Sequence, residues 1–483
     1  MTDGKRWLAF AAALVAILMD LIDSTITQVA APSMRNDLGG SYADLQWITA
    51  AYTLAMAVML LTGGRLGDMY GRKRMLLLGA AGFTAASVAA TLAPSTEALI
   101  AFRALQGGLG AVMVPQVFGL IRDLFAPQDM GKAFGILGPA AGLSAVIGPV
   151  LSGLLIDANL LGTGWRMIFL VNLPAGIFVL VAGSKFLPNV APSVDSKRLD
   201  LTGVGLAAAG AFMLVYPLVQ GHELGWPTWS LALMAGSVPV LAAFAWYQVR
   251  RKRAGAVPLV EPSVFGKRSY VSGVAFALVF LAAMGGVTLS TGVLLQVGLG
   301  YSPIHASLTT SPFALGGFFG AGYGGVAMQK LGRKVLQIGL VLMGSGLTAL
   351  YVVLEQVGTG VTTWHFAAPL LVAGIGMGMV FVPLFDIAVG DVDDHEVGSA
   401  SGVLQAIQQL GMSLGIAAIG TLFFGLLGTH ADHVRDFLSA AEVTTLATVG
   451  LIVIASALAF LLPKRARAHE GEWSGAAPEP ALA

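Results

Sequence analysis

Two aspartates lie inside the first long apolar segment of the chain, where an ionisable side chain is costly. Asp20 and Asp23 fall within a run that extends from about residue 8 to residue 31. An acid at such a depth must face a cavity or a partner, and such residues commonly mark ion or proton pathways. Their spacing places both on one helical face. Asp23 is therefore our first candidate for proton coupling and Asp20 our second, with a purely structural hydrogen bond as the alternative for each.

Arg103 is the one basic residue that we place inside an apolar segment, and it needs an anionic or carbonyl partner. Asp23 lies eight residues before Ala31 and Arg103 five after Ala98, so their depths from the same membrane surface are about 12 Å and about 8 Å. The two residues are level enough to interact. In such a pair the arginine favours the ionised aspartate and exclusion of water favours the neutral one, so alternating exposure could load and release a proton. A static ion pair is the alternative.

The composition is that of a membrane protein. Charged residues make up 11% of the chain and hydrophobic residues 56%, whereas soluble domains carry about 25% charged residues. The chain has no cysteine, which excludes disulfides and thiolate metal sites. It also shows no P-loop, zinc-binding HExxH or GxSxG motif, so ATP-driven transport and hydrolysis are unsupported. We expect a protein that is not an enzyme, with no metal, cofactor or nucleic-acid partner, acting as a monomer.

Apolar runs of about 20 residues, the length that crosses a hydrocarbon core, predict an all-α membrane protein. Fourteen can be marked, at 8–31, 46–64, 75–93, 98–121, 133–156, 167–187, 200–219, 229–249, 270–297, 305–328, 335–354, 366–388, 400–425 and 443–462. Lys and Arg gather in the loops on the side of the N-terminus, and the other side has only Arg35, Arg166 and Arg435. This bias predicts that both termini lie in the cytoplasm.

The loop between the second and third segments, GRLGDMYGRKR from residue 64, has four basic residues and one acid. It resembles the loop that marks the major facilitator superfamily of secondary transporters. The resemblance implies that its charge cluster latches the two halves of the transporter on the inner side. The residues that carry the motif are Gly64, Asp68, Gly71, Arg72 and Lys73. A plain positive-inside anchor is the simpler interpretation of the same charges.

Three further segments resemble motifs of the fourteen-span drug/proton antiporter branch of that family. The run from Asp23 to Pro32 resembles its first-span motif, whose aspartate is linked to proton coupling. Arg103-x-x-Gln106-Gly-x-x-Gly resembles its span 4 motif, associated with proton transfer. The run from Trp165 to Pro174, which includes Asn172, resembles the start of its span 6, and we interpret it as an interfacial anchor.

The fifth segment resembles the antiporter motif of the family, which implies export rather than uptake. Its small residues, four apart in places, allow close approach of another helix, and its proline allows a bend. The motif residues are Gly135, Ser144, Gly148, Pro149, Ser152 and Gly153.

A weak internal repeat predicts two bundles. Gly71-Arg72-Lys73 recurs as Gly332-Arg333-Lys334, and parallel halves are expected of this superfamily. We expect a six-helix bundle at 1–187, a linker with an inserted helix pair at 188–265, and a second six-helix bundle at 266–465. The tail at 466–483 reads as disordered, being rich in Ala, Glu, Pro and Gly.

The substrate cavity is the part of the site that the sequence defines least. Gln106, Gln405, Gln408 and Gln409 are candidates for its lining, with interhelical hydrogen bonding as the alternative, and Asp386 reads as a solvated carboxylate near the end of a span. The combined prediction is a multi-pass transporter in the cell membrane that exports drugs or other small organic compounds in exchange for protons. A proton-linked importer of the same fold is the first alternative, and a membrane sensor or enzyme the second.

Overall fold

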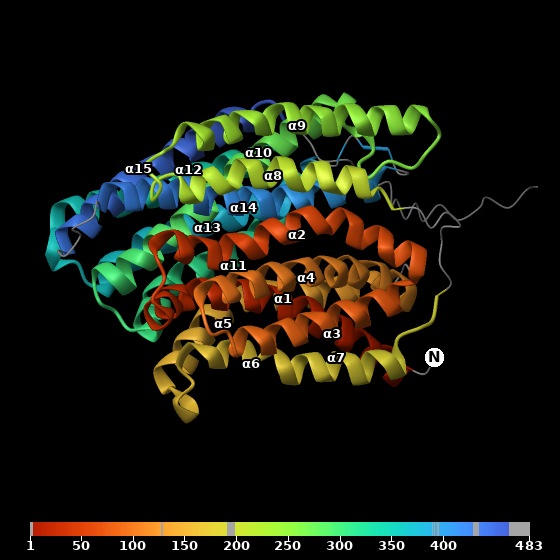
Figure 1. Ribbon diagram of the computed structural model, residues 1–483, viewed down its shortest axis with the longest axis horizontal. Helices are drawn as coiled ribbons and strands as arrows, with labels where there is room; N and C mark the ends of the chain where they lie inside the picture. Colours follow the sequence, from red (N-terminus) through yellow and green to blue (C-terminus); the bar gives the residue numbers. More distant parts are fainter. Residues whose placement is uncertain are drawn as a thin grey trace, which may run out of the picture.

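The computed structural model of the protein describes residues 3–126, 129–190, 199–388, 390, 392–393, 396–427 and 434–462. Within these ranges the chain is helical and contains no strand. The α-helices, shown in Figure 1, are α1 (Asp3–Leu38), α2 (Tyr42–Tyr70), α3 (Arg72–Thr91), α4 (Thr96–Leu124), α5 (Met130–Ala158), α6 (Met167–Leu170), α7 (Asn172–Phe186), α8 (Leu201–Gln220), α9 (Thr228–Arg253), α10 (Arg268–Val293), α11 (Pro303–Leu331), α12 (Lys334–Val357), α13 (Thr363–Ala388), α14 (Val397–Leu427) and α15 (Val434–Ala459). The predicted tail at 466–483 lies outside the described residues.

Twelve helices of the described residues are long and apolar enough to cross a membrane. Helices α5 and α11, on which two of the fourteen expected segments fall, are not among the twelve. The expected all-helical membrane fold is therefore confirmed, and the count of fourteen spans stays a prediction. The sixth expected segment is divided at Val171 into the short α6 and the longer α7.

Several helices begin at residues whose side chains satisfy free backbone N–H groups. At the start of α2, the Ser41 hydroxyl accepts a hydrogen bond from the Asp44 amide at 3.1 Å, and the Asp44 carboxylate accepts one from the Ser41 amide at 2.8 Å. This reciprocal pair is a capping box. Between α2 and α3 the chain turns at Gly71, whose φ of 92° suits glycine. We call the end of the molecule with this turn the near end, and the end where α1 passes into α2 the far end.

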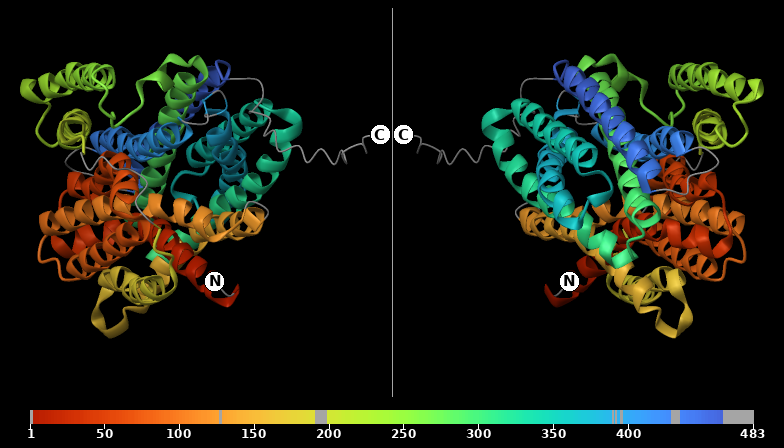
Figure 2. Two further views of the ribbon diagram at one scale, coloured as in Figure 1. Left: turned by 90° about the vertical axis from the view of Figure 1, so that its right-hand side faces the viewer. Right: turned by 90° about the vertical axis from the view of Figure 1, so that its left-hand side faces the viewer.

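The helices pack as two sets with a pair beside them. Helices α1 to α7 contact one another, as do α10 to α15, while α8 and α9 pair and α8 lies against α2 and α14. The end-on views in Figure 2 show the α8–α9 pair at the periphery. At the far end, the Glu223 carboxylate accepts a hydrogen bond from the Ala43 amide at 2.9 Å. The α8–α9 connection therefore contacts the first turn of α2.

Glycines set the close packing inside each set in matching ways. A Cβ at Gly107 of α4 would lie 2.2 Å from the Tyr52 carbonyl oxygen of α2. A Cβ at Gly374 of α13 would lie 2.1 Å from the Phe313 carbonyl oxygen of α11. Since real Cβ atoms do not approach so closely, only glycine allows these helix backbones to touch.

The repeated Gly-Arg-Lys sequences also play matching parts. Lys73 donates to the carbonyl oxygens of Ser184 and Leu187 at the end of α7, both at 2.8 Å. Arg333 donates to those of Phe460 and Leu462 at the end of α15, both at 2.6 Å. In each set, a cation at the start of the third long helix binds free carbonyl groups at the end of the last one, which favours stable helix ends.

Candidate functional site

Asp23 and Arg103 form a buried ion pair between α1 and α4. The guanidinium Nη1 lies 2.5 Å from the Asp23 Oδ2, and the side chains are 1% and 2% exposed for the arginine and the aspartate. Arg103 Nε also donates to the Ile48 carbonyl oxygen at 3.3 Å, and the guanidinium lies 4.3 Å from the centre of the Tyr52 ring. The pairing expected from the depths of the two residues is present.

Two amides complete the coordination of the aspartate. Gln106 of α4 and Asn172 of α7 each donate to the Asp23 Oδ1 at 2.7 Å. The Ser87 hydroxyl accepts from the same two amides, at 2.8 Å and 3.3 Å. The Gln106 Oε1 accepts from Arg103 at 2.6 Å. Three side chains of α4 and α7 thus donate to the carboxylate, and Ser87 of α3 holds two of them, which compensates for its removal from water.

Asp20 lies on the same face of α1 but has a different partner. Its Oδ1 accepts a hydrogen bond from the Tyr52 hydroxyl, and the aspartate and the tyrosine are 5% and 1% exposed. The Tyr52 ring is also the one that lies against the Arg103 guanidinium. Asp20 and Asp23 therefore reach the same arginine, one through an aromatic ring and one directly.

Sequence reasoning missed Tyr52 and Ser87, and it gave Asn172 another role. Asn172 was expected to belong to an interfacial anchor, but it is 3% exposed and binds Asp23. The one signal in the sequence for the role of Asn172 was its amide side chain inside an apolar segment. A tyrosine or a serine in an apolar helix is too common to indicate a site.

Two cations of the expected latch at 64–74, Arg72 and Lys73, have partners on their own set of helices. Arg72 pairs with Asp123 of α4 at 3.2 Å and with Asp68 of α2 at 3.5 Å. Lys73 binds the end of α7, as described above. Gly64 lies beside the Pro115 side chain, where a Cβ would have ordinary contact at 3.8 Å. In this structure the Arg72 ion pairs join α2, α3 and α4.

The expected antiporter motif on α5 lies against both sets. On one side, the Ser152 hydroxyl donates to the Ile26 carbonyl oxygen of α1 at 3.0 Å, and a Cβ at Gly148 would lie 2.0 Å from the Thr25 hydroxyl. On the other side, a Cβ at Gly153 would lie 2.4 Å from the Ile304 Cα of α11. The close approach predicted from small residues is confirmed at these positions.

Among the remaining motif residues of α5, Pro149 also contacts the second set. The Pro149 carbonyl oxygen accepts from the Ser307 hydroxyl of α11 at 2.7 Å. Ser144 is buried, and Gly135 lies in the first half of α5. Helix α5 is therefore a direct contact between the two sets.

The four glutamines do not share one environment. Gln106 has no exposed surface and belongs to the Asp23 network. Gln405, Gln408 and Gln409 of α14 are partly buried, and the Gln409 amide lies 3.3 Å from the Met56 sulfur of α2. The side chain of Asp386 lies outside the described residues. Helix α14 thus turns at least one amide toward the first set.

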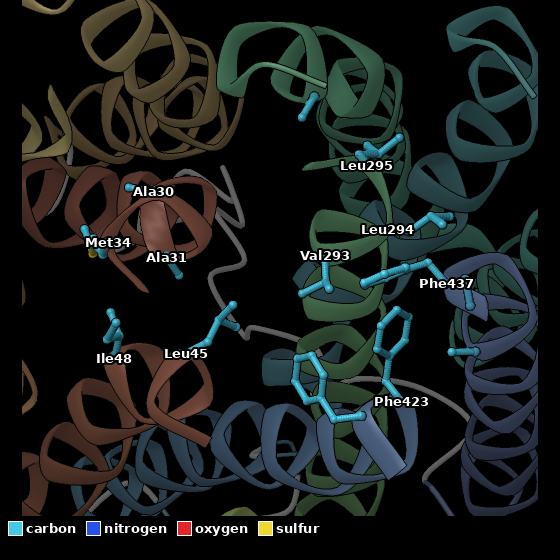
Figure 3. Packing of buried hydrophobic residues seen from close by; sticks show 14 of the residues in the cluster. Ala30, Ala31, Met34, Leu45, Ile48, Val293, Leu294, Leu295, Phe423 and Phe437 are labelled. Carbon is cyan, nitrogen blue, oxygen red and sulfur yellow. The ribbon is translucent and has the colours of Figure 1, made fainter. Parts of the chain in front are cut away.

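An apolar cluster joins the two sets at the far end. Figure 3 shows residues of α1 and α2 on one side and residues around the end of α10, on α14 and on α15 on the other. The labelled members are Ala30, Ala31, Met34, Leu45, Ile48, Val293, Leu294, Leu295, Phe423 and Phe437. At the same end of the molecule, the Asp157 carboxylate at the end of α5 accepts a hydrogen bond from the Ser302 hydroxyl at 2.6 Å. The far end is therefore closed in this structure.

A charged cluster fixes the inserted pair to the second set at the near end. Lys267, just before α10, pairs with Asp393 at 2.8 Å and with Glu396 at 3.2 Å. The Asp393 carboxylate raises the pKa of Lys267 above its ordinary value. Lys252 at the end of α9 pairs with Glu261, whose backbone amide donates to the Ser399 hydroxyl of α14 at 3.1 Å. These residues connect α9, α10 and the segment before α14.

The long apolar helices and the buried charge pair define a multi-pass membrane protein. The family model of the Major Facilitator Superfamily matches residues 13–416, and the chain belongs to this family. It is therefore a member of a transporter family rather than an enzyme.

Curated relatives include exporters of antibiotics. The chain is 47% identical over 448 residues to a probable actinorhodin transporter of Streptomyces coelicolor, covering 92% of this chain and 77% of that one. It is 33% identical to the tetracenomycin C resistance and export protein of Streptomyces glaucescens, with 88% and 77% covered. It is also 33% identical to a puromycin resistance protein of Streptomyces alboniger, with 95% and 92% covered.

Solved structures agree on the fold. A bacterial homologue of the human lysosomal transporter Spinster, in an inward-facing and unoccupied conformation, matches with a TM-score of 0.69 at 17% identity. The match covers 95% of this chain and 97% of that one. At this identity the likeness shows a shared fold and nothing of the substrate.

Proposed function

We propose that the protein is a proton-coupled secondary transporter that exports small organic compounds, antibiotics among them, by alternating access. The proposal rests on the buried ion pair of Asp23 and Arg103. It is supported by relatives that are named as antibiotic export or resistance proteins.

Proton coupling follows from competition for the Asp23 carboxylate. In the closed site, Arg103, Gln106 and Asn172 all donate to this group. Movement of α4 or α7 relative to α1 would remove these donors, and we propose that the carboxyl then binds a proton in their place. In this proposal, a change in the packing of the helices changes the protonation of the Asp23 carboxylate.

Asp20 adds a second protonatable group beside the first. The Tyr52 hydroxyl donates to it, and the same tyrosine ring lies against Arg103. We propose that Asp20 responds to the position of Arg103 and assists Asp23. Gln405, Gln408 and Gln409 are proposed to line the substrate path between the sets, since one of them already reaches α2.

The proposed architecture has fourteen spans, with both termini on the cytoplasmic side and the inner face at the near end. The first bundle would end at residue 187, the inserted pair would lie within 188–265 and the second bundle would extend from 266 to 465. The packing of α8 and α9 beside the two sets supports this division. We also propose that the protein acts as a monomer.

The closed far end is proposed to be one of the two states of the transport cycle. Export requires that the apolar cluster and the contact between Asp157 and Ser302 separate when the substrate leaves. The antiporter motif on α5 forms part of this contact through Gly153. We propose that the latch residues Gly64, Asp68, Gly71, Arg72 and Lys73 act at the opposite end.

Transport into inverted membrane vesicles tests the proposal. Actinorhodin, tetracenomycin C and puromycin are the probes, since they appear in the names of the relatives. With an acidic interior, a proton-coupled exporter accumulates its substrate inside the vesicle. An importer of the same fold drives substrate out, and a sensor or enzyme produces no proton-dependent movement. Either of the last two results with every probe would overturn the proposal.

A further inference from the structure

A groove at the near end, between the start of α3 and the chain that follows α7, carries positive charge. It has a volume of about 320 Å³ and is lined by Lys73, Arg74, Leu77, Leu78 and Asn189. Of these five residues, the transport mechanism above uses only Lys73, which belongs to the proposed latch. We call it the α3 groove.

The ion pairs of the described residues leave the charge of the α3 groove without an acidic partner. Of the neighbouring cations, Arg72 is neutralised by Asp68 and Asp123. Within the described ranges, no acidic side chain forms an ion pair with Lys73 or Arg74. Among the described residues, Lys73 and Arg74 are therefore cations without an acidic partner, and Arg74 is exposed to an approaching anion.

The two cations differ in how they are held. Lys73 donates to two backbone carbonyl oxygens, so its ammonium is fixed and keeps one N–H of three for another acceptor. Arg74 is exposed, and its planar guanidinium can bind a phosphate with two parallel hydrogen bonds. The Asn189 amide, also exposed, adds a neutral donor to the rim.

The wall below these donors is apolar and open. Leu78 is 57% exposed and lies four residues after Arg74 on α3, which places it about 6 Å further along the helix axis. A ligand in the groove would therefore meet cations at one level and hydrocarbon one turn deeper. A phospholipid has a charged headgroup followed by a hydrocarbon chain, which matches this arrangement. A soluble anion would gain nothing from the apolar wall.

We propose that the α3 groove binds an anionic phospholipid, with its phosphodiester at Lys73 and Arg74 and an acyl chain along Leu78. Basic pockets between membrane helices are known to hold anionic headgroups. Because Lys73 also holds the end of α7, a bound lipid would stabilise the contact between α3 and α7. The inference does not depend on the transported substrate or on proton coupling.

Lipid retention by the purified full-length protein tests the proposal. The protein in detergent is titrated with phosphatidylglycerol or with phosphatidylcholine, and bound lipid is counted by native mass spectrometry. We expect phosphatidylglycerol to be retained in preference. Arg74→Gln should weaken its binding about five-fold, the effect of removing about 1 kcal/mol for one basic residue near the headgroups. Arg435→Gln, at the exposed start of α15 at the far end, removes the same charge away from the groove and should change nothing.

The variants of Lys73 and Arg74 and the choice of lipid give results that either support or overturn the proposal. Lys73→Gln should weaken binding as Arg74→Gln does, but it can also disturb the end of α7. Within the part of the chain that the structure describes, Arg74 makes no such contact, so its variant tests the site with the fold intact, as thermal unfolding will verify. Equal retention of the two lipids, or unchanged binding by Arg74→Gln, would overturn the proposal. Displacement of phosphatidylglycerol by inorganic phosphate at equal concentration would show a soluble-anion site and also overturn it.

Discussion

The carboxylate of Asp23 lies 2.5 Å from the guanidinium of Arg103, although 80 positions separate the two residues in the chain. Both side chains are almost fully buried. An ion pair in such surroundings has a large desolvation cost, and removal of one partner leaves the other charge uncompensated. The pair is therefore sensitive both to mutation and to any movement that separates α1 from α4.

Asp23→Asn should abolish proton-driven transport. The variant keeps the Oδ1 to which Gln106 and Asn172 donate, so the protein should insert and fold. It cannot bind or release a proton at this position. Transport in inverted vesicles should fall to the level of vesicles without the protein.

The control for that experiment separates stability from coupling. Loss of the charge on Asp23 leaves Arg103 buried without its counter-ion, which costs about 3–5 kcal/mol when one partner of such a pair is removed. The double variant Asp23→Asn with Arg103→Gln should recover thermal stability but no transport. Proton-driven transport at the normal rate by Asp23→Asn would remove this residue from the mechanism.

Asn172→Leu should destabilise the protein by about 1.5–3 kcal/mol, the cost typical of a hydrogen bond to a charged group. Its amide donates to the Asp23 Oδ1 at 2.7 Å, and leucine has a similar size but no donor. Thermal unfolding in detergent measures the effect. Asn36→Leu, at the exposed end of α1, is the matched control and should change stability by less than about 0.5 kcal/mol. Equal effects of the two substitutions would contradict the assigned role of Asn172.

The case of Asn172 shows what the sequence could predict and where it stopped. Helix type and approximate bounds followed from apolar length, because a bilayer requires satisfied backbone groups over a set thickness. The partner of Asp23 followed from depth, because charged residues in apolar segments are few. Neutral partners such as Asn172 could not be predicted. An amide side chain has only a modest free-energy cost in a membrane helix, so its presence there does not indicate a site. Whether the Asn172 side chain points toward Asp23 depends on how α7 packs against α1.

A pair of introduced cysteines should report closure of the far end. The chain has no cysteine of its own, so only Asp157→Cys and Ser302→Cys can react. The two native side chains are exposed and lie within 2.6 Å of each other. We expect rapid cross-linking by a mild oxidant, loss of transport in the cross-linked protein, and recovery on reduction.

A control pair tests whether that cross-link reflects proximity. Asp157→Cys with Thr228→Cys places the second thiol at the exposed start of α9, a helix packed against α8. This pair should react slowly, if at all. Cross-linking of the first pair that leaves transport unaffected would show that the far end need not open.

Gly153→Ala should disfavour the closed far end. The new Cβ would lie 2.4 Å from the Ile304 Cα, and neither backbone can move aside without displacing its helix. Overpacking of this kind costs about 1–3 kcal/mol, so cross-linking between cysteines at 157 and 302 should slow by about 5-fold to 150-fold. Transport should fall as well, because a transporter that cannot close one end cannot complete its cycle. Gly322→Ala on α11 is the matched control, since a Cβ there has nothing within 4 Å and should alter neither measurement. If the Gly153→Ala variant cross-links and transports at the same rates as the protein with Gly153, the tight contact between α5 and α11 is not part of the transport cycle.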